Sequence, residues 1–360
     1  SRFSSGKNIT AERIHEVGEY PVYGGNGLRG FTDSYNFDGE CAIIGRQGAY
    51  CGNVKYIVGK AYMSEHAIVA VTTIDHNNKY FSYKLSLAHL GRFSGQAAQP
   101  GLSVTKLLRL KFEMPSKLYQ DKVASILSTY DTLIENNTKR IRLLEKMAEN
   151  LYKECFAFRK IKNNSSLVRL TDIISISRGL SYSSAEIDVK EGMDLINLKN
   201  IQAYGGFRYD GTKKYKGKYK EEQIVQEGDL VMGVTDMTQD RRTVGSVALI
   251  PKVNNLSVIS ADLIKVSSEI SNVFLFGMFK YGNISKYIAQ FANGANVLHL
   301  RPGVLHNIKV LLPNQKLIDE YVCNVEPMIR EVNILYQNSK LLARQRDLLL
   351  PRLMSGKLEV

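Results

Sequence analysis

The sequence has few of the features that mark membrane-spanning, secreted or metal-binding proteins. No apolar run approaches the roughly 18 residues that a membrane span needs. The four cysteines form no C-x-x-C pair and have no histidine at zinc-ligand spacing. We therefore expect free cysteines, a cytoplasmic location and no membrane association.

Signatures of bound cofactors are missing as well. The segment YPVYGGNGLRGFTD has the G-x-G-x-x-G spacing of a dinucleotide-binding loop. However, it lacks a long preceding strand, a following helical pattern, and an acidic residue about 20 positions later. The segment GGFRYDGTKK fails as a phosphate-binding loop, because Thr212 precedes Lys213 where the motif needs a lysine before the hydroxyl residue. We predict no cofactor in this chain.

The sequence also contains no recognisable catalytic motif. The six histidines form no ligand-spaced pair. Neither the N-P-P-Y or D-P-P-Y stretch of adenine methyltransferases nor a P-D…E-x-K nuclease pattern is recognisable. The sequence therefore predicts no catalytic residues and no metal site.

A basic charge balance is what the sequence does have. Its formal net charge is +13, spread over the chain and not held in one tail. Such a charge favours a polyanionic partner such as nucleic acid. A basic but unspecialised surface is the alternative, and charge alone does not separate the two.

The chain also repeats itself. LSVTKLLRLKFEMP (102–115) aligns with LRPGVLHNIKVLLP (300–313) at a shift of 198 positions. FSGQA (93–97) matches FANGAN (291–296), and RFSSGKNIT (2–10) resembles SISRGLSYS (175–183). The order is therefore lobe, helix, lobe, helix, with predicted boundaries at 1–115, 116–160, 161–313 and 314–360.

Each repeat ends in a proline followed by a predicted long helix. Ser116 and Asn314 supply side-chain oxygens for the first turns, and apolar residues then recur at three–four spacing. Pro327 is expected to kink the second helix or delay its start. A narrow apolar seam favours antiparallel pairing of the two helices as a coiled-coil spacer; two helices on unrelated cores are the alternative. The predicted pairing residues are Val123, Ile126, Tyr130, Leu133, Ile141, Leu144, Leu151, Val322, Val325, Ile329, Val332, Tyr336 and Leu342.

The two lobes are predicted to be rich in β-strands. Segments 40–59, 227–235 and 243–250 combine β-forming residues with glycine turns, whereas 79–87 and 273–292 favour short helices. The expected fold class is α+β, with two β-rich lobes, two long antiparallel helices and a pseudo-two-fold internal repeat.

Polar residues in glycine-punctuated turns of both lobes are candidates for DNA contact. Arginine and glutamine suit guanine and adenine edges, and lysine suits phosphate. A solvated hairpin is the alternative for the lysine-rich segment GTKKYKGKYKEE. The candidates are Lys7, Asn26, Arg29, Arg46, Gln47, Tyr50, Arg92, Gln96, Arg178, Tyr182, Arg208, Lys213, Lys214, Lys216, Gln239, Arg241, Arg242 and Asn296.

Several stretches resemble one family over essentially the whole chain. YPVYGGNGLRGFTDSYNFDGECAIIGRQGAYCGNV, MPSKLYQDKVASIL, LEKMAENLYKECF and LLLPRLMSGKLEV are similar to specificity subunits of type I restriction–modification systems. The resemblance implies two target-recognition domains, each reading one half of a bipartite, asymmetric site in double-stranded DNA. It also implies a non-catalytic chain that assembles with two modification (methyltransferase) subunits and with restriction/translocase subunits. S-adenosylmethionine, ATP and Mg²⁺ would then belong to those partner subunits.

Two other functions are weighed against this one. The first is a self-contained DNA methyltransferase or endonuclease with its own recognition domains, and the second is a protein-only coiled-coil adaptor. DNA modification by the purified chain alone would favour the first, and absence of salt-sensitive DNA binding would favour the second. The second lobe opens with LVRLTDIISISRG but the first only with SRFSSG, so we also expect residues before Ser1 in the native protein.

Overall fold

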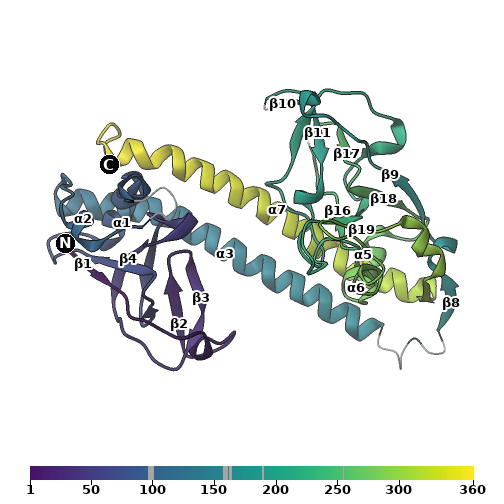
Figure 1. Ribbon diagram of the computed structural model, residues 1–360, viewed down its shortest axis with the longest axis horizontal. Coiled ribbons are helices and arrows are strands. Elements are labelled where there is room, and N and C mark those ends of the chain that lie inside the picture. Colours follow the sequence, from purple (N-terminus) through teal and green to yellow (C-terminus); the bar gives the residue numbers. More distant parts are fainter. Residues whose placement is uncertain (96–100, 157–160, 162–163, 189, 254) are drawn as a thin grey trace. The chain divides into compact units, whose positions relative to one another are not determined.

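The computed structural model describes residues 1–95, 101–156, 161, 164–188, 190–253 and 255–360. The chain forms two compact units, which we call unit 1 (Ser1–Asn136 with Asn338–Val360) and unit 2 (Asn137–Gln337). Each unit contains one β-rich lobe and a part of both long helices (Figure 1).

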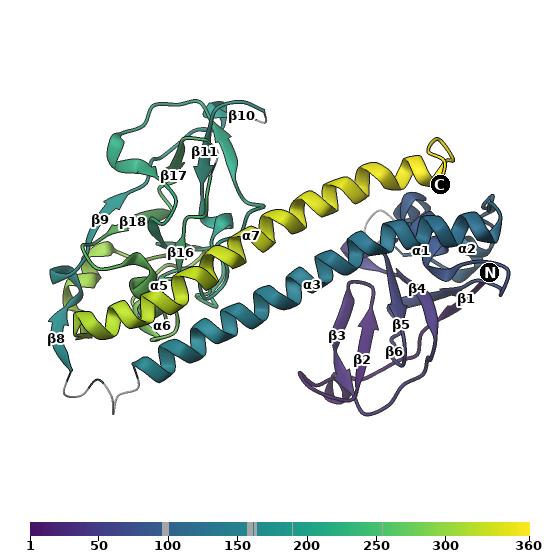
Figure 2. The same ribbon diagram turned by 180° about the vertical axis from the view of Figure 1, so that it is seen from behind.

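The lobe of unit 1 combines two small sheets with short helices (Figure 2). Its four-stranded sheet is antiparallel with the order β1-β7-β4-β5, and its three-stranded sheet has the order β3-β2-β6. The elements are β1 (Arg2–Ser5), β2 (Tyr20–Gly24), β3 (Gly27–Thr32), β4 (Glu40–Gly45), β5 (Val54–Val58), β6 (Tyr62–Met63), β7 (Ala67–Val71), α1 (Asn78–Leu87) and α2 (Val104–Leu108).

The lobe of unit 2 repeats this plan with additions. Its four-stranded antiparallel sheet has the order β9-β18-β14-β16, and a five-stranded sheet has the order β10-β12-β11-β17-β13. The elements are β8 (Ser165–Arg169), β9 (Ser175–Arg178), β10 (Ile187–Asp188), β11 (Met193–Ile196), β12 (Lys213–Tyr215), β13 (Ile224–Val225), β14 (Leu230–Gly233), β15 (Thr235–Asp236), β16 (Val247–Leu249), β17 (Ser257–Ile259), β18 (Leu263–Ser267), α5 (Asn272–Lys280), α6 (Ile284–Ala289), β19 (Leu298–His299) and β20 (Lys309–Pro313).

The four-stranded sheets have the same order because strands β1, β7, β4 and β5 correspond to β9, β18, β14 and β16. In both sheets the central strand is apolar on both faces. Ile43 and Ile44 of β4 belong to different buried clusters, as do Val231 and Met232 of β14. Alternate side chains of a strand point to opposite faces, so each sheet is covered on both sides. The structure thus confirms the predicted repeat and fold class.

The long helices begin where the sequence predicted. In α3 (Lys117–Cys155) the Ser116 Oγ accepts from the Tyr119 N–H at 3.4 Å, and in α7 (Gln315–Met354) the Asn314 Oδ1 accepts from the Leu317 N–H at 3.0 Å. Residues 157–160, the end of the predicted first helix, lie outside the described residues. Pro327 does not delay the start of α7, which begins twelve residues earlier and continues through it.

The two helices are antiparallel where they meet inside each unit. In unit 1 the Tyr119 hydroxyl donates to the Leu353 carbonyl at 2.8 Å, and Arg346 contacts Asp131. In unit 2 Arg140 and Glu331 form an ion pair at 2.7 Å. The helices also pack on the lobes, because Val123 and Leu127 share a cluster with Tyr80 and Tyr83 of α1.

The predicted apolar seam differs from the buried stripe at two positions. Ile126 and Leu133 are 38% and 43% exposed, whereas Leu127 and Leu335, which the prediction omitted, are 0% and 4% exposed. One position along a helix turns the side chain by about 100°, so an error of one residue moves it off the buried face. Of the other predicted residues, Val123, Ile141 and Val325 are buried, and the half-buried ones are Tyr130, Leu144, Leu151, Val322, Ile329, Val332, Tyr336 and Leu342.

Candidate nucleic-acid interface

The same loop follows the central strand in both lobes. In unit 1 the Gly45 N–H donates to the Asn53 carbonyl at 2.8 Å, and in unit 2 the Gly233 N–H donates to the Ser246 carbonyl at 2.9 Å. We call these segments the β4–β5 loop (46–53) and the β14–β16 loop (234–246). Their closing hydrogen bonds match, so the two loops occupy equivalent positions in the two repeats.

A glycine closes each loop for the same physical reason. Gly52 and Gly245 have φ of 84° and 74°, a conformation that other residues rarely adopt. A Cβ on Gly52 would also lie 2.1 Å from the Gly91 nitrogen, and one on Gly245 would lie 2.8 Å from the Ser285 carbonyl oxygen. The glycines therefore bring each loop against a later helical segment of its lobe, Leu90–Phe93 in unit 1 and α6 in unit 2.

The structure gathers the candidates of unit 1 around a short turn, Ser64–His66. The Arg46 N–H donates to the His66 carbonyl at 3.0 Å, and a Cβ on Gly25 would lie 3.2 Å from that same oxygen. Lys7 is bridge-paired with Ser64, and its N–H donates to the adjacent Met63 carbonyl at 2.9 Å. The Ser64–His66 turn thus touches the β4–β5 loop, the β2–β3 turn and the segment after β1.

These contacts bring most of the candidates in unit 1 together. Lys7, Asn26, Arg29, Gln47 and Tyr50 are exposed residues of these adjoining segments. Arg46 is half-buried beside them, and the exposed Arg92 lies over the Phe93 ring at 4.8 Å. Gln96 lies outside the described residues.

Glu65 and His66 are polar residues of this turn that the sequence did not single out. Glu65 Oε1 lies 3.0 Å from His66 Nε2 and 3.9 Å from Arg29 Nη1. The only sequence signal was the polar triplet Ser64–His66 between the apolar residues of β6 and β7. A prediction would have needed the pairing of β6 with β2, which places the turn beside Arg29.

In unit 2 a buried carboxylate shapes the β14–β16 loop. Asp236 is 3% exposed, and its oxygens accept from the backbone N–H groups of Thr238 at 2.8 Å and Thr243 at 2.7 Å. Burial alone would raise the pKa of Asp236, but these hydrogen bonds outweigh it and lower the pKa. The charged carboxylate therefore fixes a loop whose tip carries the candidates.

The tip of that loop presents amide and guanidinium groups. Gln239 Nε2 donates to the Ala295 carbonyl at 2.9 Å, beside the exposed Asn296. Arg241 has a positive φ of 54°, and Arg242 forms an ion pair with Asp240. Gln239, Arg241, Arg242 and Asn296 are thus brought together, and they correspond to the β4–β5 loop candidates of unit 1.

The lysine-rich segment of unit 2 has a different environment from the one predicted. Lys214 pairs with Asp194 at 2.7 Å, and Lys216 pairs with Asp188 at 2.9 Å. Hydrogen bonds from the Lys190 N–H and from Lys216 hold the pKa of Asp188 well below its usual range. Lys213 donates to the Tyr182 hydroxyl at 3.0 Å. Phosphate contact by Lys214 and Lys216 would therefore compete with their own acidic partners.

Two further arginines lie apart from this cluster of lysines. Arg208 pairs with Asp210 at 3.1 Å in the segment between β11 and β12. Arg178 is exposed at the end of β9. Among the described residues, no group of three or more histidine, cysteine, aspartate or glutamate side chains is arranged to hold a metal ion. Nor does any helix in the described part of the chain have the length and apolar character to cross a membrane.

Comparison with known proteins gives a consistent result. Residues 2–146 and 163–327 match the family model described as type I restriction modification DNA specificity domain. The type I restriction enzyme EcoprrI specificity subunit of Escherichia coli is 39% identical over 153 residues, which are 41% of this chain and 38% of that subunit. The MjaIX specificity subunit of Methanocaldococcus jannaschii is 24% identical over 308 residues, covering 78% of this chain and 68% of that one.

A solved structure shares the fold. The crystal structure of the type I restriction–modification S subunit from M. genitalium has a TM-score of 0.67 and 16% identity to this chain. The match covers 98% of this chain and 93% of that chain. The arrangement of repeated lobes and long helices is therefore an established fold.

Proposed function

Because the chain belongs to the family of the type I restriction modification DNA specificity domain, we propose that it selects the DNA sequence on which a type I restriction–modification complex acts. In this role each lobe contacts one half of a bipartite site in double-stranded DNA. The chain contributes recognition and assembly, and the chemistry belongs to other subunits.

One observation carries the proposal. The β4–β5 and β14–β16 loops occupy equivalent positions, yet one presents Arg46, Gln47 and Tyr50 and the other presents Gln239 and Arg241. Arginine and glutamine make bidentate hydrogen bonds to guanine and adenine edges in the major groove. Loops of different length that present these groups in a different order, on equivalent scaffolds, suit an asymmetric site whose two halves differ in sequence.

The charge balance supports a DNA partner. A net charge of +13 favours association with phosphates and predicts that affinity falls as salt is raised. Phosphate contacts orient a protein on the duplex, whereas contacts to base edges discriminate between sequences. We assign the first role to exposed cations such as Lys7 and Arg178, and the second to the loop residues.

The family is also the basis on which we propose partner subunits. We propose that the long helices hold the lobes of each unit and present surfaces to two modification subunits, and that restriction/translocase subunits join this assembly. S-adenosylmethionine, ATP and Mg²⁺ would be bound by those subunits. This chain would then be inactive alone, in contrast to a self-contained methyltransferase or endonuclease.

Mapping of methylated adenines in cells with and without the gene tests this function. We expect one bipartite motif to lose its methylation when the gene is deleted, and to regain it when the chain is supplied on a plasmid. An unchanged methylation map would contradict the proposal. DNA methylation or cleavage by the purified chain alone would favour the self-contained enzyme instead.

A further inference from the structure

Glu65 has an unusual environment for a surface carboxylate. Its side chain is 32% exposed, but its Oε2 atom is enclosed and has no hydrogen-bond partner among the described residues. Oε1 lies within hydrogen-bond distance of His66 Nε2, and Arg29 Nη1 is farther away at 3.9 Å. Because Oε2 is enclosed, a ligand that approaches from solvent must be bound through Oε1.

The position of Glu65 is shared by the two repeats, but its chemistry is not. Gly6 and Gly179 both lie against the equivalent serines Ser64 and Ser260, so Glu65 corresponds to Ala261. The next residue, Asp262, accepts a hydrogen bond from Thr235 within its own lobe at 3.0 Å. As far as the described residues show, a partly exposed carboxylate within ion-pair distance of an arginine therefore occurs at this position in unit 1 and not in unit 2.

The spacing of the two groups matches one base pair. In the major groove a G·C pair presents guanine O6 and N7 as acceptors and the cytosine N4 amino group as a donor. O6 and N4 hydrogen-bond to each other, so they lie about 3 Å apart. Arg29 Nη1 and Glu65 Oε1, 3.9 Å apart and both a third exposed, offer a donor and an acceptor at nearly that spacing.

The ion pair leaves both Arg29 and Glu65 able to form hydrogen bonds to a base pair. A distance of 3.9 Å is too long for a hydrogen bond, so the guanidinium keeps its donors. Glu65 Oε1 has a second lone pair beyond the one directed at His66. The attraction between the two charges holds them side by side, and base binding would add hydrogen bonds without breaking one.

We propose that Arg29 and Glu65 together read one G·C base pair in the half-site contacted by unit 1, with Arg29 on guanine and Glu65 on the cytosine amino group. The inference rests on the proposed function, since it names the bases read at that interface. It predicts that both residues determine which base pair is recognised at the same position of the same half-site.

The test compares methylation motifs in cells that carry the full complex. The wild-type chain defines the motif, and Arg29→Ala and Glu65→Ala are each expected to relax one G·C position, the same one in both variants. Discrimination at that position should fall roughly 5- to 150-fold, and the other half-site should stay unchanged. Glu65→Gln keeps the shape of the side chain and should relax the same position, because its amide group adds donors beside the acceptor.

Asp38→Asn serves as the matched control. Asp38 is an exposed carboxylate that lies at the opposite end of β4 from Arg46 and the β4–β5 loop. Its motif should equal that of the wild type. Relaxation of different positions by the arginine and glutamate variants, or an unchanged motif in both, would overturn the inference while leaving the proposed function intact. Absence of any bipartite motif in the wild type would overturn both. Thermal unfolding of each purified complex shows that a changed motif does not come from a misfolded lobe.

Discussion

Single glycines set the close approaches on which both lobes depend. Gly6 follows β1 and Gly179 follows β9, and their N–H groups donate to Ala67 and Leu263 at 3.0 Å and 3.1 Å. A Cβ would lie 2.1 Å from the Ser64 carbonyl oxygen in the first case and 2.0 Å from the Ser260 carbonyl oxygen in the second. Backbone atoms cannot move aside as a side chain does, so a larger residue at either position strains the fold.

We therefore expect Gly6→Ala and Gly179→Ala each to lower the free energy of unfolding by about 3 kcal/mol, the upper end of what overpacking costs. Gly303→Ala is the control, because no atom lies within 4 Å of its Cβ position. Thermal unfolding of the three purified variants measures the difference. Equal stability of Gly6→Ala and Gly303→Ala would show that the segment after β1 adjusts freely.

Residue identity alone could not show which cations are available to DNA. Arg29, Arg46 and Arg241 could be chosen because they lie in turns punctuated by glycine. The partners of Lys214 and Lys216 could not be found in this way. Asp194 and Asp188 lie 20 or more positions away, and only the pairing of β12 with β11 and β10 brings them alongside.

At the scale of elements, local sequence signals were sufficient to predict where the long helices begin. They were not sufficient to predict which face of each helix is buried. The proline, the capping residue and the apolar period placed both helix starts within one residue. The stripe was misplaced at Ile126 because a coiled-coil pattern assumes one partner helix. Val123 and Leu127 also pack against Tyr80 and Tyr83 of α1, so tertiary contacts with the lobe define the buried face.

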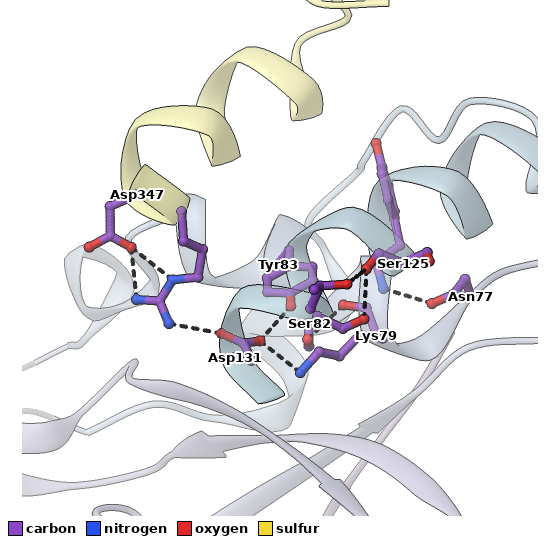
Figure 3. Close-up of polar contacts among 11 residues, drawn as sticks. Asn77, Lys79, Ser82, Tyr83, Ser125, Asp131 and Asp347 are labelled. Atoms are coloured by element: carbon purple, nitrogen blue, oxygen red, sulfur yellow. Dashed lines mark hydrogen bonds and ion pairs between the residues drawn. The ribbon is translucent and has the colours of Figure 1, made fainter. Parts of the chain in front are cut away.

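A charged network joins three helices of unit 1 (Figure 3). Asp131 of α3 accepts a hydrogen bond from the Tyr83 hydroxyl of α1. It also pairs with Lys79 of α1 at 2.9 Å and with Arg346 of α7 at 2.8 Å. Burial alone would raise the pKa of Asp131, but the hydrogen bonds from Tyr83, Arg346 and Lys79 outweigh it and lower the pKa. The network therefore stabilises the folded state while the carboxylate is charged.

The sign of its pH dependence follows from that lowered pKa. Stabilisation is complete above the unfolded pKa of about 3.9 and is lost as the pH falls through the lower folded value. Asp131→Asn should cost about 2 kcal/mol near neutral pH, the size of a hydrogen bond to a charged group. The cost should shrink in acid, below about pH 3. Thermal unfolding of wild type, Asp131→Asn and the exposed control Asp38→Asn checks this; an equal loss at both pH values would contradict it.

At the scale of the whole molecule, the internal repeat was visible in the sequence only as separate short matches. The shift was 198 between Leu102 and Leu300, but it is 173 between Gly6 and Gly179 and 188 between Gly45 and Gly233. Loops of different length change the shift along the chain, so alignment by one offset finds only part of the repeat. The strand order makes the correspondence continuous.

The repeat makes one lobe replaceable as a unit. Ser165 and Pro313 are register partners in the β8–β20 pair, so the first and last strands of the second lobe lie side by side. An exchange of residues 161–313 therefore cuts the chain at two adjacent points and leaves α3 and α7 unchanged. This exchange replaces the β14–β16 loop, to which we assign one half-site, and keeps the β4–β5 loop, to which we assign the other.

We expect cells carrying this chimera, with a lobe taken from another family member, to methylate a motif in which one half is new. The other half should be retained, because Arg29, Arg46 and Gln47 are untouched. The gap between the halves should also be retained, because the helices are the same. Sequencing of methylated adenines measures both properties, with the unaltered chain on the same plasmid as control. A change in both halves would mean that the lobes do not read independently, and the assignment of one half-site to each loop would then be wrong.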